Sequence, residues 1–190
     1  WTKWSAAMPT ARPHILETSM TLPLPREQVF AFFADAGNLE RITPPNLHFE
    51  ILAGRNILIT EGMLIDYKLR LLGVPFAWQS RISRWEPPAI FVDEQLRGPS
   101  DLWIHTHTFT EEDGVTTIAD RVQYRLPLWP LGEIALPLVR LQLRHIFAYR
   151  QRIIRHIFPV ESGGDKEPEF IGTLNINTAR VDQFLLWPYI

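Results

Sequence analysis

Residues 102–126 read LWIHTHTFTEEDGVTTIADRVQYRL and contain the clearest secondary-structure signal in the chain. On both sides of the segment 111–114, apolar or aromatic side chains recur at every second position, which is the period of a strand with one buried face. The segment itself, Glu-Glu-Asp-Gly, has the composition of a turn. The stretch therefore predicts an antiparallel hairpin in which the numbers of paired positions sum to about 225.

This register places polar groups among aromatic ones on the inward face of the hairpin. It sets His105 opposite Asp120, and residues 89–97, as the preceding antiparallel strand, bring Asp93 near His105. The inward face of the three strands then carries Phe91, Asp93, Gln95, Trp103, His105, His107, Phe109, Ile118, Asp120, Val122, Tyr124 and Leu126. A face that is mostly apolar should point toward the core.

The rest of the chain completes an α+β pattern. A strand is predicted from His14, followed by two short helices over 26–34 and 38–42. Further strands are predicted near 47–53, 57–60, 63–72, 74–86 and 89–97. Gly132 to Phe158 is predicted to form one long helix, in which Pro137 either introduces a kink or lies near the true first turn.

Helical spacing gives this long helix an apolar stripe that should cover the sheet. The stripe contains Leu136, Val139, Leu143, Ile146, Phe147, Ile153, Ile154 and Ile157. Arg150 lies near its centre, where a guanidinium needs a partner or must reach water, and Asp93 and Asp120 are the available inward carboxylates. The opposite face is basic, with Arg140, Arg144, Arg152 and Arg155, and is either simply solvated or a surface for an anionic partner or lipid.

The inward residues predict a mostly apolar concavity with Asp93, His105, Asp120 and Arg150 converging in it. Such a mixture is typical of a small-molecule pocket, and it is also what a satisfied buried ion network would look like. The predicted ligand-binding residues are Tyr67, Phe76, Trp78, Phe91, Asp93, Trp103, His105, His107, Phe109, Tyr124, Phe147 and Arg150.

Several function classes are disfavoured by composition. Across 190 residues, 19 Lys and Arg against 21 Asp and Glu give a formal charge of −2, so no basic field favours nucleic acid. With no cysteine, thiolate metal sites, cysteine nucleophiles and thiol redox chemistry are excluded. Phosphate-binding glycine loops, a dinucleotide fingerprint and a nucleophile elbow are also missing, and no cofactor is predicted.

The His105-Thr106-His107 motif allows two kinds of chemistry. Two imidazoles on one side of a strand, with Asp93 or Asp120, could bind a metal, but the surrounding aromatic residues favour packed, hydrogen-bonded histidines, so no metal is predicted. A His105–Asp120 pair could instead perform acid–base catalysis, with Arg150 holding an anion or enolate. The predicted catalytic set, if the protein is an enzyme, is His105, Asp120 and Arg150.

The sequence divides into an N-terminal extension (1–13), a core domain (14–158) and a polar linker with an apolar tail (159–190). The apolar tail is expected to fold back on the domain or to dock on a partner. No stretch reaches the roughly 18 uninterrupted apolar residues of a membrane span, so we expect a cytoplasmic protein. A protein complex or membrane-surface partner, contacted through 1–13, 170–190 and the basic helix face, is the open alternative.

A series of motifs in order links the core to a known group. They are LERITPP at 39–45, LLGVPF at 71–76 with Trp78, WEPP at 85–88, FVDEQ at 91–95, Gly98-Pro99, Trp103-x-His105-Thr106-His107-x-Phe109, Asp120-x-Val122-x-Tyr124 and Tyr149-Arg150. Together they resemble the polyketide cyclase/dehydrase branch of the START-like (SRPBCC, birch-pollen-allergen-like) superfamily over about residues 14–158.

The resemblance implies a helix-grip fold, in which a curved antiparallel sheet of about six or seven strands wraps a long C-terminal helix and encloses a hydrophobic cavity. Relatives bind lipids, sterols, quinones, polyketides or other apolar molecules, and a minority catalyse cyclisation or dehydration. The leading hypothesis is therefore binding of a small hydrophobic molecule. A cyclase- or dehydratase-type enzyme and an accessory subunit of a larger, membrane-bound complex are the alternatives.

Overall fold

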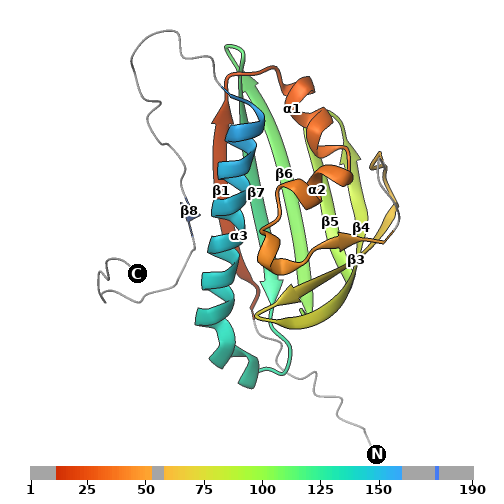
Figure 1. The fold of residues 1–190 in the computed structure, drawn as a ribbon, viewed down its shortest axis with the longest axis vertical. Coiled ribbons are helices and arrows are strands. Elements are labelled where there is room, and N and C mark those ends of the chain that lie inside the picture. The colour runs from red at the N-terminus through yellow and green to blue at the C-terminus, as the bar shows by residue number, and fades with distance from the viewer. Residues whose placement is uncertain (1–11, 53–57, 160–173, 176–190) are drawn as a thin grey trace, which may run out of the picture.

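The computed structural model describes residues 12–52, 58–159 and 174–175, and it has the architecture expected from the sequence. A curved antiparallel sheet has the strand order β2-β3-β4-β5-β6-β7-β1-β8, and α1, α2 and α3 lie on one face of it (Figure 1). The strands are β1 (His14–Leu22), β2 (Glu50–Ile51), β3 (Leu64–Leu71), β4 (Val74–Glu86), β5 (Ile90–Arg97), β6 (Leu102–Glu112), β7 (Val115–Arg125) and β8 (Leu174–Asn175). The helices are α1 (Arg26–Phe33), α2 (Gly37–Arg41) and α3 (Leu136–Ile157), with short 3₁₀ turns at Pro45–Leu47 and Leu131–Ala135.

The β6–β7 hairpin forms, but its register differs from the prediction by two residues. His107, not His105, is the partner of Asp120, and His105 is opposite Val122. The reason is a tighter turn than the four-residue segment suggested: Glu112 still pairs with Val115, and only Asp113 and Gly114, both with positive φ, make the reversal. A shift of two residues keeps every side chain on its predicted face.

Two other predicted strands are shorter than the sequence suggested. Of 47–53, only Glu50–Ile51 pairs in the sheet, because Pro45–Leu47 forms a 3₁₀ turn just before it. Of 57–60, Leu58 makes only an isolated bridge with Asp35, and residue 57 lies outside the described residues.

The long helix α3 begins at Leu136, four residues after the predicted start. Pro137 lies in its first turn, where the missing backbone N–H costs no hydrogen bond. The residues of α3 that are buried are Leu143, Phe147, Arg150 and Ile154, so the arginine lies inside the apolar stripe as the spacing predicted. Within the described residues, no helix is both long and apolar enough to cross a membrane.

Two residues of the C-terminal tail belong to the described part of the chain, and they pair with the domain. Leu174–Asn175 pairs antiparallel with Thr18 and Glu17 and so extends the sheet beyond β1. The other residues of the predicted linker and tail beyond Pro159, like residues 1–11 of the N-terminal extension, lie outside the described residues.

Candidate functional site

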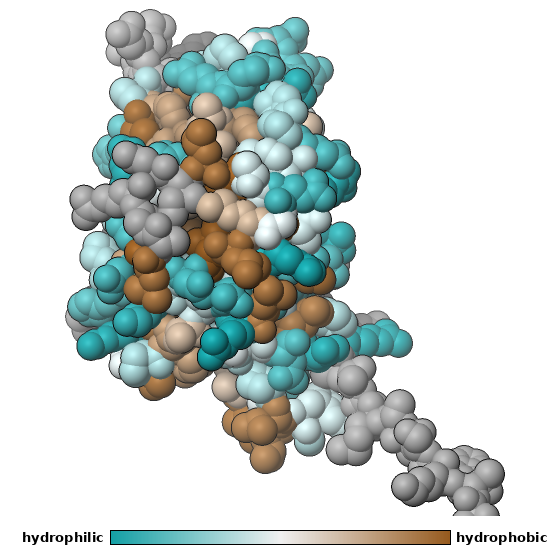
Figure 2. Space-filling view, turned by 90° about the vertical axis from the view of Figure 1, so that its right-hand side faces the viewer, coloured by the Kyte–Doolittle hydropathy of each residue, from teal (hydrophilic) through white to brown (hydrophobic). Residues whose placement is uncertain are grey.

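A cavity of about 490 Å³ lies between the sheet and the helices packed on it. Its walls come from the strands β3 to β7, from α1, α2 and the segment after α2, and from α3. Leu72, Val74 and Leu128 belong to its lining and are themselves exposed, so the cavity reaches the surface at the end where the β3–β4 turn meets the loop after β7. Apolar side chains also come to the surface on the face of the molecule seen in Figure 2.

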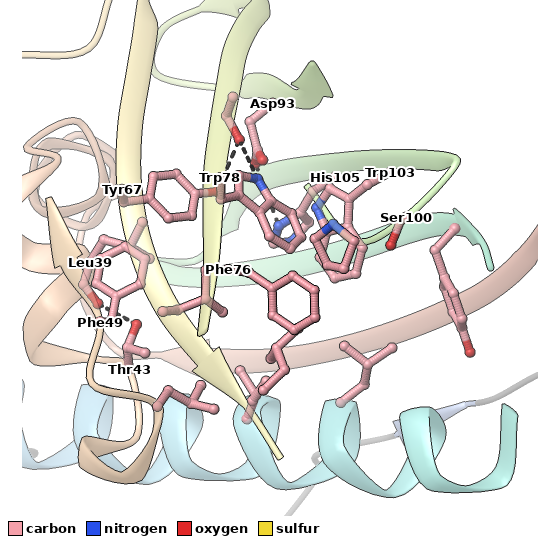
Figure 3. A pocket seen from close by; sticks show the side chains of 18 of the residues that line it. Leu39, Thr43, Phe49, Tyr67, Phe76, Trp78, Asp93, Ser100, Trp103 and His105 are labelled. Atoms are coloured by element: carbon pink, nitrogen blue, oxygen red, sulfur yellow. Dashed lines mark hydrogen bonds and ion pairs between the residues drawn. The ribbon is translucent and has the colours of Figure 1, made fainter. Parts of the chain in front are cut away.

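All of the predicted ligand-binding residues except Phe109 line this cavity. Asp93 and His105 lie together on its sheet side, and Phe76 projects from the sheet toward α3 (Figure 3). Phe109 is only 1% exposed and packs under α1, with its ring centroid 5.1 Å from that of Phe30 and 5.3 Å from that of Phe33. The inward face of β6 thus divides into a part covered by α1 and a part open to the cavity, a division that strand periodicity cannot show.

The structure adds lining residues that the sequence reasoning missed. One group comes from α1, α2 and the segment up to β2: Phe33, Leu39, Ile42, Thr43, Leu47 and Phe49. Another is Ser80, which follows Phe76 and Trp78 on the inward side of β4. Ser80 is the one polar residue in the alternating series Phe76, Trp78, Ser80 and Ile82 of β4, and this exception could have indicated a polar point in the cavity wall.

Two histidines lie between two carboxylates at the polar end of the site. His105 Nε2 is 3.0 Å from Asp120 Oδ1, and His107 Nδ1 is 2.8 Å from the same oxygen, although that nitrogen is not aligned for a hydrogen bond. On the other side, Asp93 Oδ2 is 3.5 Å from His105 Nδ1 and 3.3 Å from His107 Nε2. Despite the changed register, the predicted contacts of His105 with Asp93 and Asp120 are both present. Asp120 itself lies behind the imidazoles and does not line the cavity.

Mutual interactions set the charge states in this cluster. Burial opposes ionisation of Asp120, but the two histidines outweigh it and hold the pKa of Asp120 well below its usual range. Burial likewise opposes the charge on His107, yet Asp120 and Asp93 raise the pKa of His107. For His105, burial and the neighbouring charge of His107 prevail and lower the pKa. Of the two rings, His107 therefore holds a second proton more readily than His105.

Arg150 is a buried cation that forms no ion pair or hydrogen bond among the described residues. It is 8% exposed, its Nε has no hydrogen-bond partner, and its Cζ lies 5.1 Å from the centroid of the Phe147 ring. The sequence suggested Asp93 or Asp120 as its partner, but neither carboxylate forms an ion pair with it. The pKa of Asp93 is lowered even though burial, the largest single effect, opposes this shift. The two histidines contribute most of the lowering, and the charge of Arg150 adds to it. Because Arg150 lines the cavity, its charge is available to a bound molecule.

A second polar group lies beside this cluster on β3 and β4. Tyr67 Oη is 3.0 Å from Ser80 Oγ, and Trp78 Nε1 donates a hydrogen bond of 3.1 Å to the same hydroxyl. Tyr67 stacks on Trp78, which in turn meets Trp103 edge to face. Burial, followed by the charge of Asp93, raises the pKa of Tyr67 well above 10. These contacts hold three large aromatic rings in fixed positions along the cavity wall.

Comparison with known proteins adds evidence on the fold. No protein-family model matches the chain, and no curated protein matches it in sequence. Solved structures do match. A START superfamily protein from Mycobacterium smegmatis is 12% identical with a TM-score of 0.57, and the match covers 75% of this chain and 99% of that one.

Two further structures are similar to the same extent. Ara h 8.0201 is 18% identical with a TM-score of 0.52, covering 75% of this chain and 98% of that chain. The major latex-like protein 151 from Panax ginseng is 9% identical with a TM-score of 0.56, covering 79% of this chain and all of that chain. Together with the sheet order and the long helix α3, these likenesses show that the chain has the helix-grip fold of START-like proteins.

Proposed function

We propose that the protein binds a small hydrophobic molecule in the cavity between the sheet and α3. The observation that carries this proposal is the composition of the wall: it is mostly apolar, and its charged groups, apart from Asp35, are Asp93, His105, His107 and Arg150. Sites for small apolar molecules have this form, with a few convergent polar groups that orient one end of the ligand. A volume of about 490 Å³ also falls within the range of such sites.

Filling the cavity tests this proposal. Ile146 lines the cavity from α3, whereas Leu141 lies on the exposed side of the same helix. We expect Ile146→Trp to lose both a co-purifying apolar compound, detected by mass spectrometry of gently purified protein, and the fluorescence of bound anilinonaphthalene sulfonate. Leu141→Trp should retain both. Equal binding by the two variants, or no binding by the parent protein, would contradict the proposal.

Acid–base catalysis is the second candidate, supported by the 3.0 Å contact between His105 and Asp120 beside a cavity that Arg150 also lines. In this scheme Asp120 holds the ring of neutral His105 in one tautomer, His105 takes a proton from a bound carbonyl compound, and Arg150 stabilises the enolate. A cyclase or dehydratase would need these steps. A His105→Ala variant that keeps its fold should then lose turnover of a test polyketide but still bind it, whereas unfolding of that variant would favour a purely structural network.

Docking on a larger or membrane-bound complex stays a prediction. Residues 1–11 and 176–190, which would provide most of the contact, lie outside the described residues. On the basic face of α3, Arg144 and Arg152 are exposed, and Arg140 and Arg155 are half-buried. Affinity purification of the full chain from native membranes, compared with a chain lacking residues 160–190, tests this alternative.

A further inference from the structure

The cluster of Asp93, His105 and His107 presents three metal-ligating side chains at the cavity wall. One ligating atom from each lies within 4.8 Å of the others. The three come from neighbouring strands: His105 and His107 project from the same face of β6, and Asp93 on β5 is the cross-strand partner of His105. Sequence alone favours packed histidines here, because it does not show that both rings turn a nitrogen toward the same carboxylate oxygen.

The distances to that oxygen match those in a metal site. Asp93 Oδ2 lies 3.5 Å from His105 Nδ1 and 3.3 Å from His107 Nε2. Two ligands of a tetrahedral zinc ion, each bonded at about 2.0–2.1 Å, are separated by about 3.4 Å. Two of the three distances between ligand atoms therefore match a tetrahedral site, and all three atoms lie within 4.8 Å of one another.

Asp120 supplies the outer carboxylate that metal-bound histidines usually have. Its Oδ1 lies 3.0 Å from His105 Nε2 and 2.8 Å from His107 Nδ1, the nitrogens that face away from Asp93. The hydrogen bond to Asp120 keeps the proton of His105 on Nε2, which leaves the lone pair of Nδ1 free for a metal. His107 Nδ1 is close to the same oxygen but is not aligned for a hydrogen bond, so a small rotation of this ring would let Asp120 orient it in the same way. Asp120 is buried behind the rings, so it can orient them without reaching the ion.

The charges around the site indicate what could occupy the fourth coordination position of the metal ion. With neutral imidazoles, the two carboxylates and the cation balance, and the guanidinium of Arg150 remains as one positive charge in the cavity wall. The open coordination position would face the cavity and suit an anion or the carbonyl end of a bound molecule.

We propose that Asp93, His105 and His107 bind a divalent transition metal of the zinc type, with Asp120 as the carboxylate that orients both histidines. This inference does not depend on the identity of the apolar ligand, because the metal alone is the probe. It adds a cation to the cavity where the sequence predicted none.

Titration of the full-length protein with cobalt(II) tests the site directly. The protein is first stripped with a chelator, and binding is followed by the visible absorption of four-coordinate cobalt and by calorimetry with zinc(II). We expect one metal per chain, and we expect Asp93→Asn and His107→Ala to lose it. His156→Ala and Asp66→Asn, which change exposed residues of the same types, should bind like the parent protein.

The variant Asp120→Asn separates orientation from ligation. It should still bind the metal, but 10- to 100-fold more weakly, as is typical when an outer carboxylate is changed. Circular dichroism of each metal-free variant shows whether it is folded, and Asp93→Asn, which keeps the shape of the side chain, carries the test if His107→Ala unfolds. The proposal is wrong if the folded parent binds less than about a tenth of an equivalent. It is equally wrong if Asp93→Asn binds cobalt as tightly as the parent, since the metal would then lie elsewhere on the chain.

Discussion

The guanidinium of Arg150 lies over the ring of Phe147, 5.1 Å from its centroid, and both side chains are buried beside the cavity. An aromatic face is a weak substitute for a carboxylate, so this arginine has more charge than its surroundings neutralise. A buried cation that the fold does not pair points to a use in binding rather than in stability.

Replacing Arg150 should therefore separate binding from stability. We expect Arg150→Met to weaken binding of anilinonaphthalene sulfonate, an apolar anion, by at least tenfold. The free energy of unfolding should change by less than about 1 kcal/mol, because the methionine fills similar space without a charge to desolvate. Fluorescence titration and urea denaturation measure the two effects. A loss of stability above about 2 kcal/mol with unchanged binding would identify Arg150 as a structural residue.

Asp120 should show the opposite behaviour. In the metal-free protein, Asp120→Ala is expected to lower the free energy of unfolding by about 3 kcal/mol, because it leaves the buried His107 charge without its closest carboxylate. Glu17→Ala is the matched control: Glu17 on β1 forms an ion pair with Arg121, the neighbour of Asp120 on β7, but about half of each side chain is exposed. Its removal should cost less than about 1 kcal/mol. Similar urea midpoints for the two variants would show that the buried cluster does not stabilise the fold.

The protein should lose stability at alkaline pH because of the buried side chain of Tyr67. Burial and the charge of Asp93 raise the pKa of Tyr67 above 10, so the folded protein keeps the phenolic proton at pH values where the unfolded chain has lost it. The contribution of Tyr67 to the free energy of unfolding is complete below pH 10 and falls as the pH rises above that value. Tyr67→Phe should flatten this part of the stability curve.

The measurement for Tyr67 is urea denaturation at a series of pH values from neutral to strongly alkaline. Tyr149→Phe serves as a control, because Tyr149 is half-buried on α3 and contacts Arg152 rather than the cavity cluster. Parallel curves for the parent protein and Tyr67→Phe would show that ionisation of Tyr67 is not linked to unfolding.

Leu72 at the cavity mouth combines backbone strain with exposure. Its φ is 53°, and with Gly73 it forms the turn between β3 and β4, where both central residues have positive φ. A leucine in this conformation costs about 1–2 kcal/mol relative to an unstrained one. We expect Leu72→Asn to raise the free energy of unfolding by about 1 kcal/mol, whereas Gly73→Ala should lower it.

Retention of a strained apolar side chain at this position suggests a role at the entrance. Leu72→Asn should therefore also slow the uptake of anilinonaphthalene sulfonate, measured by stopped-flow fluorescence. If the variant is more stable and takes up the probe at the parent rate, the strain at Leu72 has no function in entry.

The sequence predicted the α+β order of elements and the faces of the strands well, because both depend on local periodicity. The helix-grip fold itself was expected from the resemblance to START-like proteins. The two-residue error at His105 and His107 left each ring on its predicted face. It came from the turn, where Glu111 and Glu112 look like turn residues but continue the strand. Only the backbone angles of Asp113 and Gly114 distinguish the two cases.

The site was harder to predict where it depends on packing between distant segments. Phe109 and His107 share a face of β6 and both lie near Phe33 of α1, yet only His107 of these two lines the cavity, whereas Phe109 is enclosed by Phe30 and Phe33. Similarly, Arg150 forms no ion pair because of the distance between α3 and the strands that carry Asp93 and Asp120. The periodicity of a helix or strand predicts the face of a residue but not this distance. Neither relationship has a signature in local sequence.

The pairing of Leu174–Asn175 with Glu17 and Thr18 covers part of the outer edge of β1. Without it, β1 would end the sheet with unpaired N–H and C=O groups, which invite a strand from a neighbouring copy. The tail occupies that edge for two residues and thereby blocks continued growth of the sheet at this point. Removing it would turn the β1 edge into an open template for intermolecular strand addition.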